Sequence, residues 1–439
     1  MDSDDETEGQ IPAQVQVDES DNESEEADGK ILSDDPGPFF SEGLELIQER
    51  RAESHMKGLN ILRSTLARLS CSEAVDDARE ELFMCLLNSV KRGKEKESTE
   101  ASEVLSMCVL ALGPEEEDLF SQISPVLEEV ALKGKKPGIR AAALRALTFA
   151  CFISTMEHSH TWHVFDLLYG IIATAGTKLK MVGDEQILEA ACDSFGLLAS
   201  TIQRSYFAGS NFEKTISRLG PLLTHGTPAV RTAAGQTLAM VFEINQSLEH
   251  GSTSRKPSGD RHRGFSVHSQ ADESDETDEA RAELLAELSN VMSEEEVIEA
   301  VETLAGEYDR SKGKQERKEQ RSVFRDIVST ISRGEAPETT LTIRNEDLTF
   351  DSWAHILQLN SIRRVLGGGF QFHFRNNRLV RSIFGLGEAP VEDGDDRLSK
   401  LEKRLFLSEN SAAKKEKSKE RNKDRRNKHN AKNQFMTCD

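Results

Sequence analysis

The sequence lacks the long hydrophobic segments of membrane proteins. It contains no run of about 18 consecutive apolar residues, so we expect no membrane-spanning helix. Its first residues are acidic and lack an apolar stretch, so we also expect no secretory signal. Hydrophobic residues make up only 37% of the chain and charged residues 30%, a balance that predicts disorder in part of it.

Cysteine is scarce and shows no pairing pattern. Five of the six cysteines lie in apolar helical stretches, where a free thiol acts as a small hydrophobic group. No Cys-x-x-Cys or zinc-ligand spacing occurs, so the usage fits a reducing compartment, and we expect a cytoplasmic or nuclear protein, or both. The six residues are Cys71, Cys85, Cys108, Cys151, Cys192 and Cys438.

Known catalytic signatures are also missing. No Gly-x-Ser-x-Gly, His-Glu-x-x-His or protein-kinase motif occurs. The three glycines at 367–369 lack the Lys-Ser/Thr partner of a phosphate-binding loop. We therefore predict that the protein is not an enzyme and has neither a cofactor nor a small-molecule substrate.

One dense histidine cluster admits two interpretations. Glu157, His158, His160 and His163 could hold a metal ion, since three histidines suffice for an open zinc site. At the start of a helix, however, this spacing spreads the side chains over more than one face, and no further Cys or carboxylate pattern supports a metal. We favour a solvated helix start and predict no metal site.

The net charge of −22 is unevenly distributed. Residues 1–35 hold fourteen acidic residues and one lysine, whereas residues 411–433 hold ten Lys or Arg and three acidic residues. An acidic head with a basic tail predicts two partners of opposite charge, or a head that covers the tail.

A repeated pattern indicates the architecture. Pro137 and Arg140, followed by alanines, return 91 residues later as Pro228 and Arg231, and each copy opens an apolar helix. Proline suits the first turn of a helix, where its missing N–H is not needed. Small-residue counterparts at Ala190 and near positions 58 and 101 give spacings of roughly 41 to 48 residues, typical of HEAT and armadillo arrays.

Apolar residues at spacings of three and four mark the helix faces that should pack in such an array. Residues 162–172 are apolar nearly all round, so we expect the most buried helix there, with Trp162 and Tyr169 in the core. The stripes around the two prolines are Phe120, Ile123, Leu127 and Val130; Ile139, Ala143, Leu147, Ala150 and Ile153; Phe212, Ile216, Leu219 and Leu223; and Val230, Ala234, Leu238 and Val241.

These patterns predict an all-α protein, with a HEAT/armadillo-like α-α superhelix followed by a smaller helical domain and a basic helix. The expected segments are a disordered acidic tail at 1–38, the repeat domain at 39–248, a disordered linker at 249–278, a C-terminal helical domain at 279–388, and an acidic spacer with a basic helical tail at 389–439.

Finer signals lie within the expected C-terminal domain. One helix face holds residues 284, 288 and 292, and Ser293 with Glu296 forms a capping box before the next helix. Alternation at 341–343 and 348–350 predicts a short hairpin. A helix should follow at 351–366 and end at the three glycines, before a last short helix at about 379–384.

The basic tail is the most specific binding signal. From Lys415 to Arg425 cations recur at every second residue, which spreads them around a helix and suits a groove walled by nucleic acid. A nuclear localisation signal and a solvated helix paired through Glu416, Glu420 and Asp424 remain alternatives. The candidate RNA- or ribosome-binding residues are Lys414, Lys415, Lys417, Lys419, Arg421, Lys423, Arg425, Arg426 and Lys428.

A second candidate surface mixes arginines with phenylalanines. Arginine and aromatic side chains together can stack on RNA bases, although such phenylalanines also occur as core residues. The candidate contacts are Arg363, Arg364, Arg375 and Arg378, which interleave with Phe370, Phe372 and Phe374.

Several blocks of the sequence resemble the interferon-related developmental regulator family. The resemblance is carried by residues 320–326, 334–338, 351–353 and 365–367, and by Ser411-Ala-Ala before the basic run. The repeat region is similar to the helical-repeat domain of that family.

The resemblance implies a non-enzymatic regulator of gene expression. The family is associated with binding ribosomes and holding them translationally idle, with a C-terminal helix that enters an RNA-walled channel. It is also associated with transcriptional co-regulation through deacetylase corepressor complexes. We therefore expect a ribosome or RNA as partner, or alternatively a nuclear corepressor complex, and no membrane.

Overall fold

A computed structural model describes residues 36–178, 184–225, 227–249, 292–306, 314–343 and 346–387. All the described helices belong to one compact unit. The acidic head, the helix face at 284–292, most of the expected linker and the basic tail lie outside the described residues.

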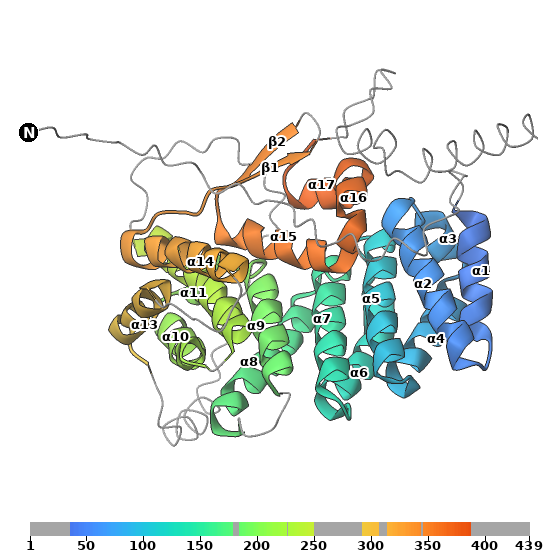
Figure 1. Ribbon diagram of the computed structural model, residues 1–439, viewed down its shortest axis with the longest axis horizontal. Coiled ribbons are helices and arrows are strands. Elements are labelled where there is room, and N and C mark those ends of the chain that lie inside the picture. Colours follow the sequence, from blue (N-terminus) through green and yellow to red (C-terminus); the bar gives the residue numbers. More distant parts are fainter. Residues whose placement is uncertain are drawn as a thin grey trace, which may run out of the picture. The chain divides into compact units, whose positions relative to one another are not determined.

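Five antiparallel helix pairs follow one another between Gly37 and Glu249 (Figure 1). The first helices of the pairs are α1 (Gly37–Gln48), α4 (Arg79–Arg92), α6 (Glu117–Lys133), α8 (His158–Lys178) and α10 (Ser210–Leu223). The second helices are α2 (Ala52–Arg68), α5 (Glu95–Leu112), α7 (Pro137–Ser154), α9 (Asp184–Ala199) and α11 (Pro228–Glu249). Two short helices, α3 (Ser72–Asp77) and η2 (Arg204–Phe207), join consecutive pairs.

The second helices of the pairs form one continuous layer, which we call the inner layer. Within it α2 packs against α5, α5 against α7, α7 against α9 and α9 against α11. Each first helix packs on the second helix of its own pair. This arrangement confirms the all-α helical-repeat fold predicted from the sequence.

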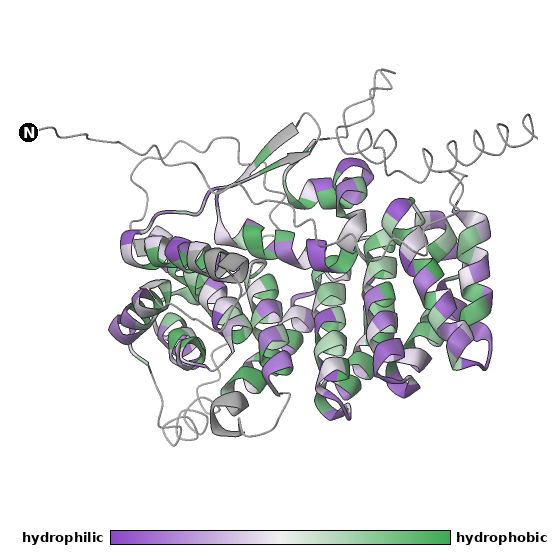
Figure 2. Cartoon of the chain, in the orientation of Figure 1, coloured by the Kyte–Doolittle hydropathy of each residue, from purple (hydrophilic) through white to green (hydrophobic). Residues whose placement is uncertain are grey.

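The residues that predicted the repeats occupy the positions that the array requires. Pro137 and Pro228 are the first residues of α7 and α11. Ala143, Ala190 and Ala234 are fully buried between helices, as small residues must be where two helices approach closely. Figure 2 shows hydrophobic and hydrophilic residues alternating along the helices of the array, the amphipathic pattern of elements packed on one side.

One expectation about the core was wrong. Helix α8 is not the most buried helix, because Trp162 and Tyr169 are only half-buried and His163 and Asp166 are exposed. As a first helix of its pair, α8 is covered mainly by α9, whereas α7 lies between α5, α6 and α9 and buries nearly every residue after Ala141.

The remaining elements follow the sequence closely. Helix α13 (Glu294–Gly306) begins with the predicted capping box, in which Ser293 N donates to Glu296 Oε2 (2.8 Å) and Glu296 N donates to Ser293 Oγ (3.3 Å). Helix α14 (Lys314–Arg333) precedes the predicted hairpin of β1 (Thr339–Ile343) and β2 (Glu346–Phe350). The last described elements are α15 (Trp353–Leu366), η3 (Gly367–Gly369), α16 (Phe370–Asn376) and α17 (Arg378–Ile383).

The predicted helix stop at the three glycines is confirmed, because α15 ends at Leu366 and Gly367 has φ +48°. None of the described helices is both long and apolar enough to cross a membrane. The domain boundaries proposed at residues 248 and 278 stay predictions, and α14 and α15 pack directly on α11.

Candidate functional site

The C-terminal helices run back along the inner layer from the last repeat to the first. We call residues 353–383, which comprise α15, η3, α16 and α17, the strap. Helix α15 contacts α11, α9 and α5, and η3 and α16 contact α2 (Figure 1). The strap therefore lies where an open helical array would present part of its inner layer to a partner.

Trp353 anchors the beginning of the strap. Its backbone N–H donates to Glu243 Oε2 of α11 (2.9 Å), and its indole Nε1–H donates to Thr330 Oγ1 of α14 (2.8 Å). The Trp353 side chain is buried, so both donors are satisfied away from water. Burial raises the pKa of Glu243 to about 7, against the opposing effects of the Trp353 N–H and of Arg204.

The middle of the strap sits closely on α9. A Cβ atom on Gly196 of α9 would lie 3.1 Å from Leu357 Cδ1 of the strap, so the glycine leaves room for a close approach of the two helices. Gln358 Nε2 donates to Ser200 Oγ (2.9 Å), directly after the end of α9. Apolar packing and a side-chain hydrogen bond thus fix the register of α15 on the array.

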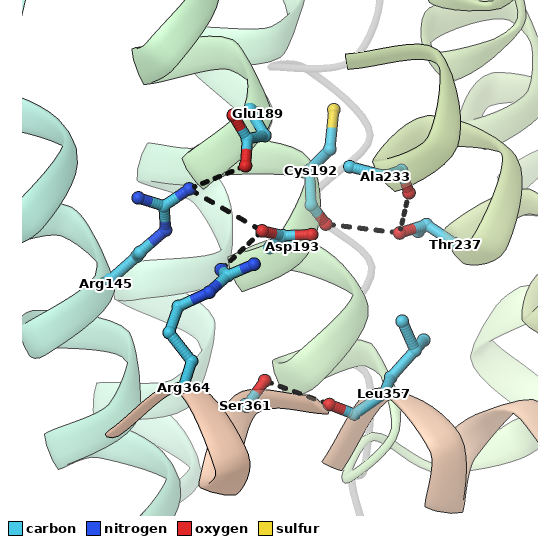
Figure 3. A network of polar contacts seen from close by, with 9 residues as sticks. All are labelled: Arg145, Glu189, Cys192, Asp193, Ala233, Thr237, Leu357, Ser361 and Arg364. Carbon is cyan, nitrogen blue, oxygen red and sulfur yellow. Dashed lines mark hydrogen bonds and ion pairs between the residues drawn. The ribbon is translucent and has the colours of Figure 1, made fainter. Parts of the chain in front are cut away.

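A network of charges crosses from α7 through α9 to the strap (Figure 3). Arg145 Nη2 of α7 lies 3.2 Å from Glu189 Oε1 and 3.7 Å from Asp193 Oδ2, both on α9. Arg364 Nη1 of the strap donates to the same Asp193 oxygen at 2.5 Å. Asp193 therefore joins the array to the strap through two arginines.

The same row of charges continues towards the first repeat. Arg63 of α2 pairs with Glu100 (3.0 Å) and Glu103 (3.0 Å) of α5. Burial raises the pKa of Glu103, while burial and then the neighbouring Arg364 lower the pKa of Arg145. These groups are partly desolvated, so removing one partner would leave the other charged and poorly solvated.

At the end of the strap, the backbone of Gly369 packs directly against the backbone of Ala67 in the first repeat. A Cβ atom on Gly369 would lie 2.3 Å from the carbonyl oxygen of Ala67 in α2, which a side chain could not tolerate. His373 Nε2–H donates to Leu66 O (2.7 Å), and its Nδ1 accepts from Asn377 Nδ2 (3.4 Å). Burial lowers the pKa of His373, in keeping with this neutral tautomer.

The predicted arginine contacts all lie on the strap. Arg363 stacks over Phe370, with 5.1 Å between its guanidinium carbon and the ring centroid, and Arg364 is engaged with Asp193. Arg375 is half-buried and Arg378 is exposed. Phe370 and Phe374 are buried. They are therefore core residues, which was the alternative to stacking on RNA bases.

The histidine cluster is divided among different partners. His163 pairs with Glu128 of α6 (2.8 Å), and the His160 ring lies edge-on to Phe120. In the described residues, no group of three or more His, Cys, Asp or Glu is placed to hold a metal ion.

The cysteines offer no reactive thiol of lowered pKa where the structure describes them. The five in the array are free, and four of them are buried. Burial raises the pKa of Cys71, Cys108 and Cys192, which keeps these thiols protonated and unreactive. They fill the core as the sequence predicted.

The residues on the array that hold the strap escaped sequence reasoning. Asp193 could have been identified from the sequence, because an acidic residue within the apolar run of α9 indicates a buried partner. Glu243 carries the same signal, since it interrupts the apolar run of α11, whereas Ala67 carries no local signal because it lies far along the sequence from Gly369. The basic tail residues predicted to bind RNA, Lys414 to Lys428, lie outside the described part of the chain.

Comparisons with known proteins point to one family. The sequence profile described as interferon-related developmental regulator matches residues 15–332, and that described as interferon-related protein conserved region matches residues 377–429. Interferon-related developmental regulator 2 of Mus musculus is 27% identical over 395 residues, which cover 87% of this chain and 80% of the relative. Interferon-related developmental regulator 1 is 25% identical in Sus scrofa and 24% in Homo sapiens, each over 428 residues that cover 92% of this chain and 85% of the relative.

Proposed function

Because the chain belongs to the interferon-related developmental regulator family, we propose that it regulates gene expression without catalysis, by binding ribosomes or RNA and holding ribosomes translationally idle. The observation that carries this proposal is the family match over residues 377–429, which includes the whole run of cations from Lys414 to Lys428. Cations spaced around a helix suit contact with phosphates on several sides.

The helical array supports the same proposal. An array of helix pairs offers an extended surface to a large partner and keeps its geometry through contacts between neighbouring repeats. In this division of roles, the array supplies the docking body and the basic tail supplies the polyanion contact. Arg375 and Arg378 on the strap are further candidates for such contact.

Sedimentation of cell extract through a sucrose gradient tests the proposal. The full chain should travel with ribosomal particles, and a chain without residues 411–433 should shift to the top of the gradient. A deletion of equal length in the predicted linker, residues 253–275, serves as the matched control and should leave sedimentation unchanged. Failure of the full chain to travel with ribosomes, or equal behaviour of the two deletions, would contradict the proposal.

The alternative role of a nuclear co-regulator that scaffolds a deacetylase corepressor complex gives a different result. In that case the basic tail acts as a nuclear localisation signal. Deleting residues 411–433 would then abolish nuclear entry in living cells, while the purified truncated chain would retain its protein partners.

A further inference from the structure

The strap is strongly cationic within an acidic protein. Residues 353–387 contain five arginines and no acidic residue, although the whole chain carries a net charge of −22. The acidic groups that contact the strap, Asp193 and Glu243, come from the array. The strap therefore brings a net positive charge of its own to the inner layer.

The five arginines of the strap have different surroundings. Arg364 pairs with Asp193, and Arg363 lies over Phe370. Arg381 is buried and donates to Phe374 O (3.4 Å) and to Gly387 O (2.8 Å). Arg375 and Arg378 remain accessible to solvent at the end of the strap, and each also takes part in an interaction within the chain.

The contact between the strap and α2 involves a helix that ends in a further arginine, Arg68. Leu66 and Ala67, which touch His373 and Gly369, are followed directly by the exposed Arg68. Arg375 lies two residues after His373 in α16, and α17, which packs on α16, begins with Arg378. Folding thus brings α2, which ends at Arg68, into contact with α16, which carries Arg375 and packs on α17 some three hundred residues later in the sequence.

The residues that follow α17, at the end of the described chain, are held in place by hydrogen bonds. The bond from Arg381 to Gly387 O, together with the bond from Leu386 N to Arg381 O (2.9 Å), ties the residues after α17 back onto that helix. The basic run of residues 411–433 begins about 25 residues further along the sequence. About 25 residues of chain therefore join the cations at the junction of α2, α16 and α17 to those of the tail, and two weak sites linked in one chain can act as one stronger site.

We propose that the junction of α2, α16 and α17, through Arg68, Arg375 and Arg378, is a second contact for the phosphate backbone of RNA, assembled only when the strap is docked on the first repeat. The proposal rests on the proposed function, since the tail is taken to engage the same RNA. Arg68 is its distinguishing element, because α2 has no part in the predicted RNA contacts.

Two pairs of variants of the full chain test this surface. Arg68→Gln removes one cation, and Arg92→Gln is its matched control, because Arg92 is exposed in the last turn of α4 as Arg68 is in α2. Gly369→Ala forces the strap away from Ala67, whereas Gly368→Ala adds a methyl group with no atom within 4 Å. Gly369 has φ −81°, so its replacement acts through this clash and not through backbone strain.

The measurement is the salt dependence of binding to a labelled single-stranded RNA. Each lost phosphate contact should reduce the slope of log K against log salt by about 0.7. We expect Arg68→Gln and Gly369→Ala to reduce the slope, and Arg92→Gln and Gly368→Ala to leave it unchanged. In the Gly369→Ala background, Arg68→Gln should have no further effect, because the surface is no longer assembled.

Faster hydrogen exchange in α16 shows that Gly369→Ala frees the strap. An unchanged circular dichroism spectrum shows that the array remains folded. Equal slopes for Arg68→Gln and Arg92→Gln, or an undiminished effect of Arg68→Gln when the strap is freed, would overturn the proposal. The proposal would also be overturned if Arg68→Gln weakened the binding of poly-glutamate as much as the binding of RNA. The surface would then not be specific for phosphate and could equally bind acidic protein. Deletion of residues 411–433 reports separately on the proposed function, because the junction contact should persist without the tail.

Discussion

At the scale of single residues, Glu243 shows how the array holds the strap. Its carboxylate accepts the first amide of α15, and burial raises its pKa to about 7 from an ordinary value of 4.5. The Trp353 N–H and then Arg204 lower this pKa, whereas Asp351 raises it. The folded protein therefore keeps a proton on Glu243 over a range in which the unfolded chain has released it.

This difference predicts the sign of a pH effect. Since the folded state binds the extra proton, the contribution of Glu243 to stability is lost as the pH rises from 4.5 to about 7. Glu243→Gln removes the titration, so from pH 5 to pH 8 the variant should gain on the order of 2 kcal/mol relative to the wild type. Urea unfolding at both pH values measures this gain, and the exposed Glu338→Gln is the control. Parallel pH profiles for Glu243→Gln and the wild type would contradict the assignment.

At the scale of elements, two helical glycines should respond to alanine in opposite directions. A Cβ on Gly196 of α9 would lie 2.7 Å from Thr237 Oγ1 and 3.1 Å from Leu357 of the strap, whereas one on Gly170 of α8 would meet nothing within 4 Å. Gly170→Ala should therefore stabilise the protein by about 0.5–1 kcal/mol through helix propensity.

Gly196→Ala should instead lower the melting temperature and speed amide exchange in α15, because the added methyl group pushes α15 and α11 away from α9. Calorimetry and hydrogen exchange measure the two effects. A stabilising Gly196→Ala would show that α15 does not pack on α9 as described.

Elements governed by local chemistry could be predicted from the sequence. The prolines that open α7 and α11, the capping box of α13 and the glycine stop after α15 each act within a few residues. The docking of the strap could not be predicted, because it depends on pairs such as Gly369 with Ala67 that lie far apart in sequence. Gly369 signals the end of a helix in the sequence, and only the fold reveals that it also permits a backbone contact.

At the scale of the whole molecule, charge is separated along the chain. If the basic tail contacts six phosphates, log K for RNA should fall with log salt with a slope of about −4 to −5. Removal of residues 411–433 should bring the slope close to the contribution of the junction alone. Filter binding over a range of salt concentrations measures the slope, and a slope near zero for the full chain would rule out a polyanion contact.

The strap also changes how the array should lose its structure. In an open array each repeat depends only on its neighbours, so unfolding can begin at either end and proceed stepwise. Here α16 touches α2 while α15 touches α11, so the strap links the first repeat to the fifth. Fraying of the first repeat would loosen the fifth as well, so the array should unfold as a single cooperative unit.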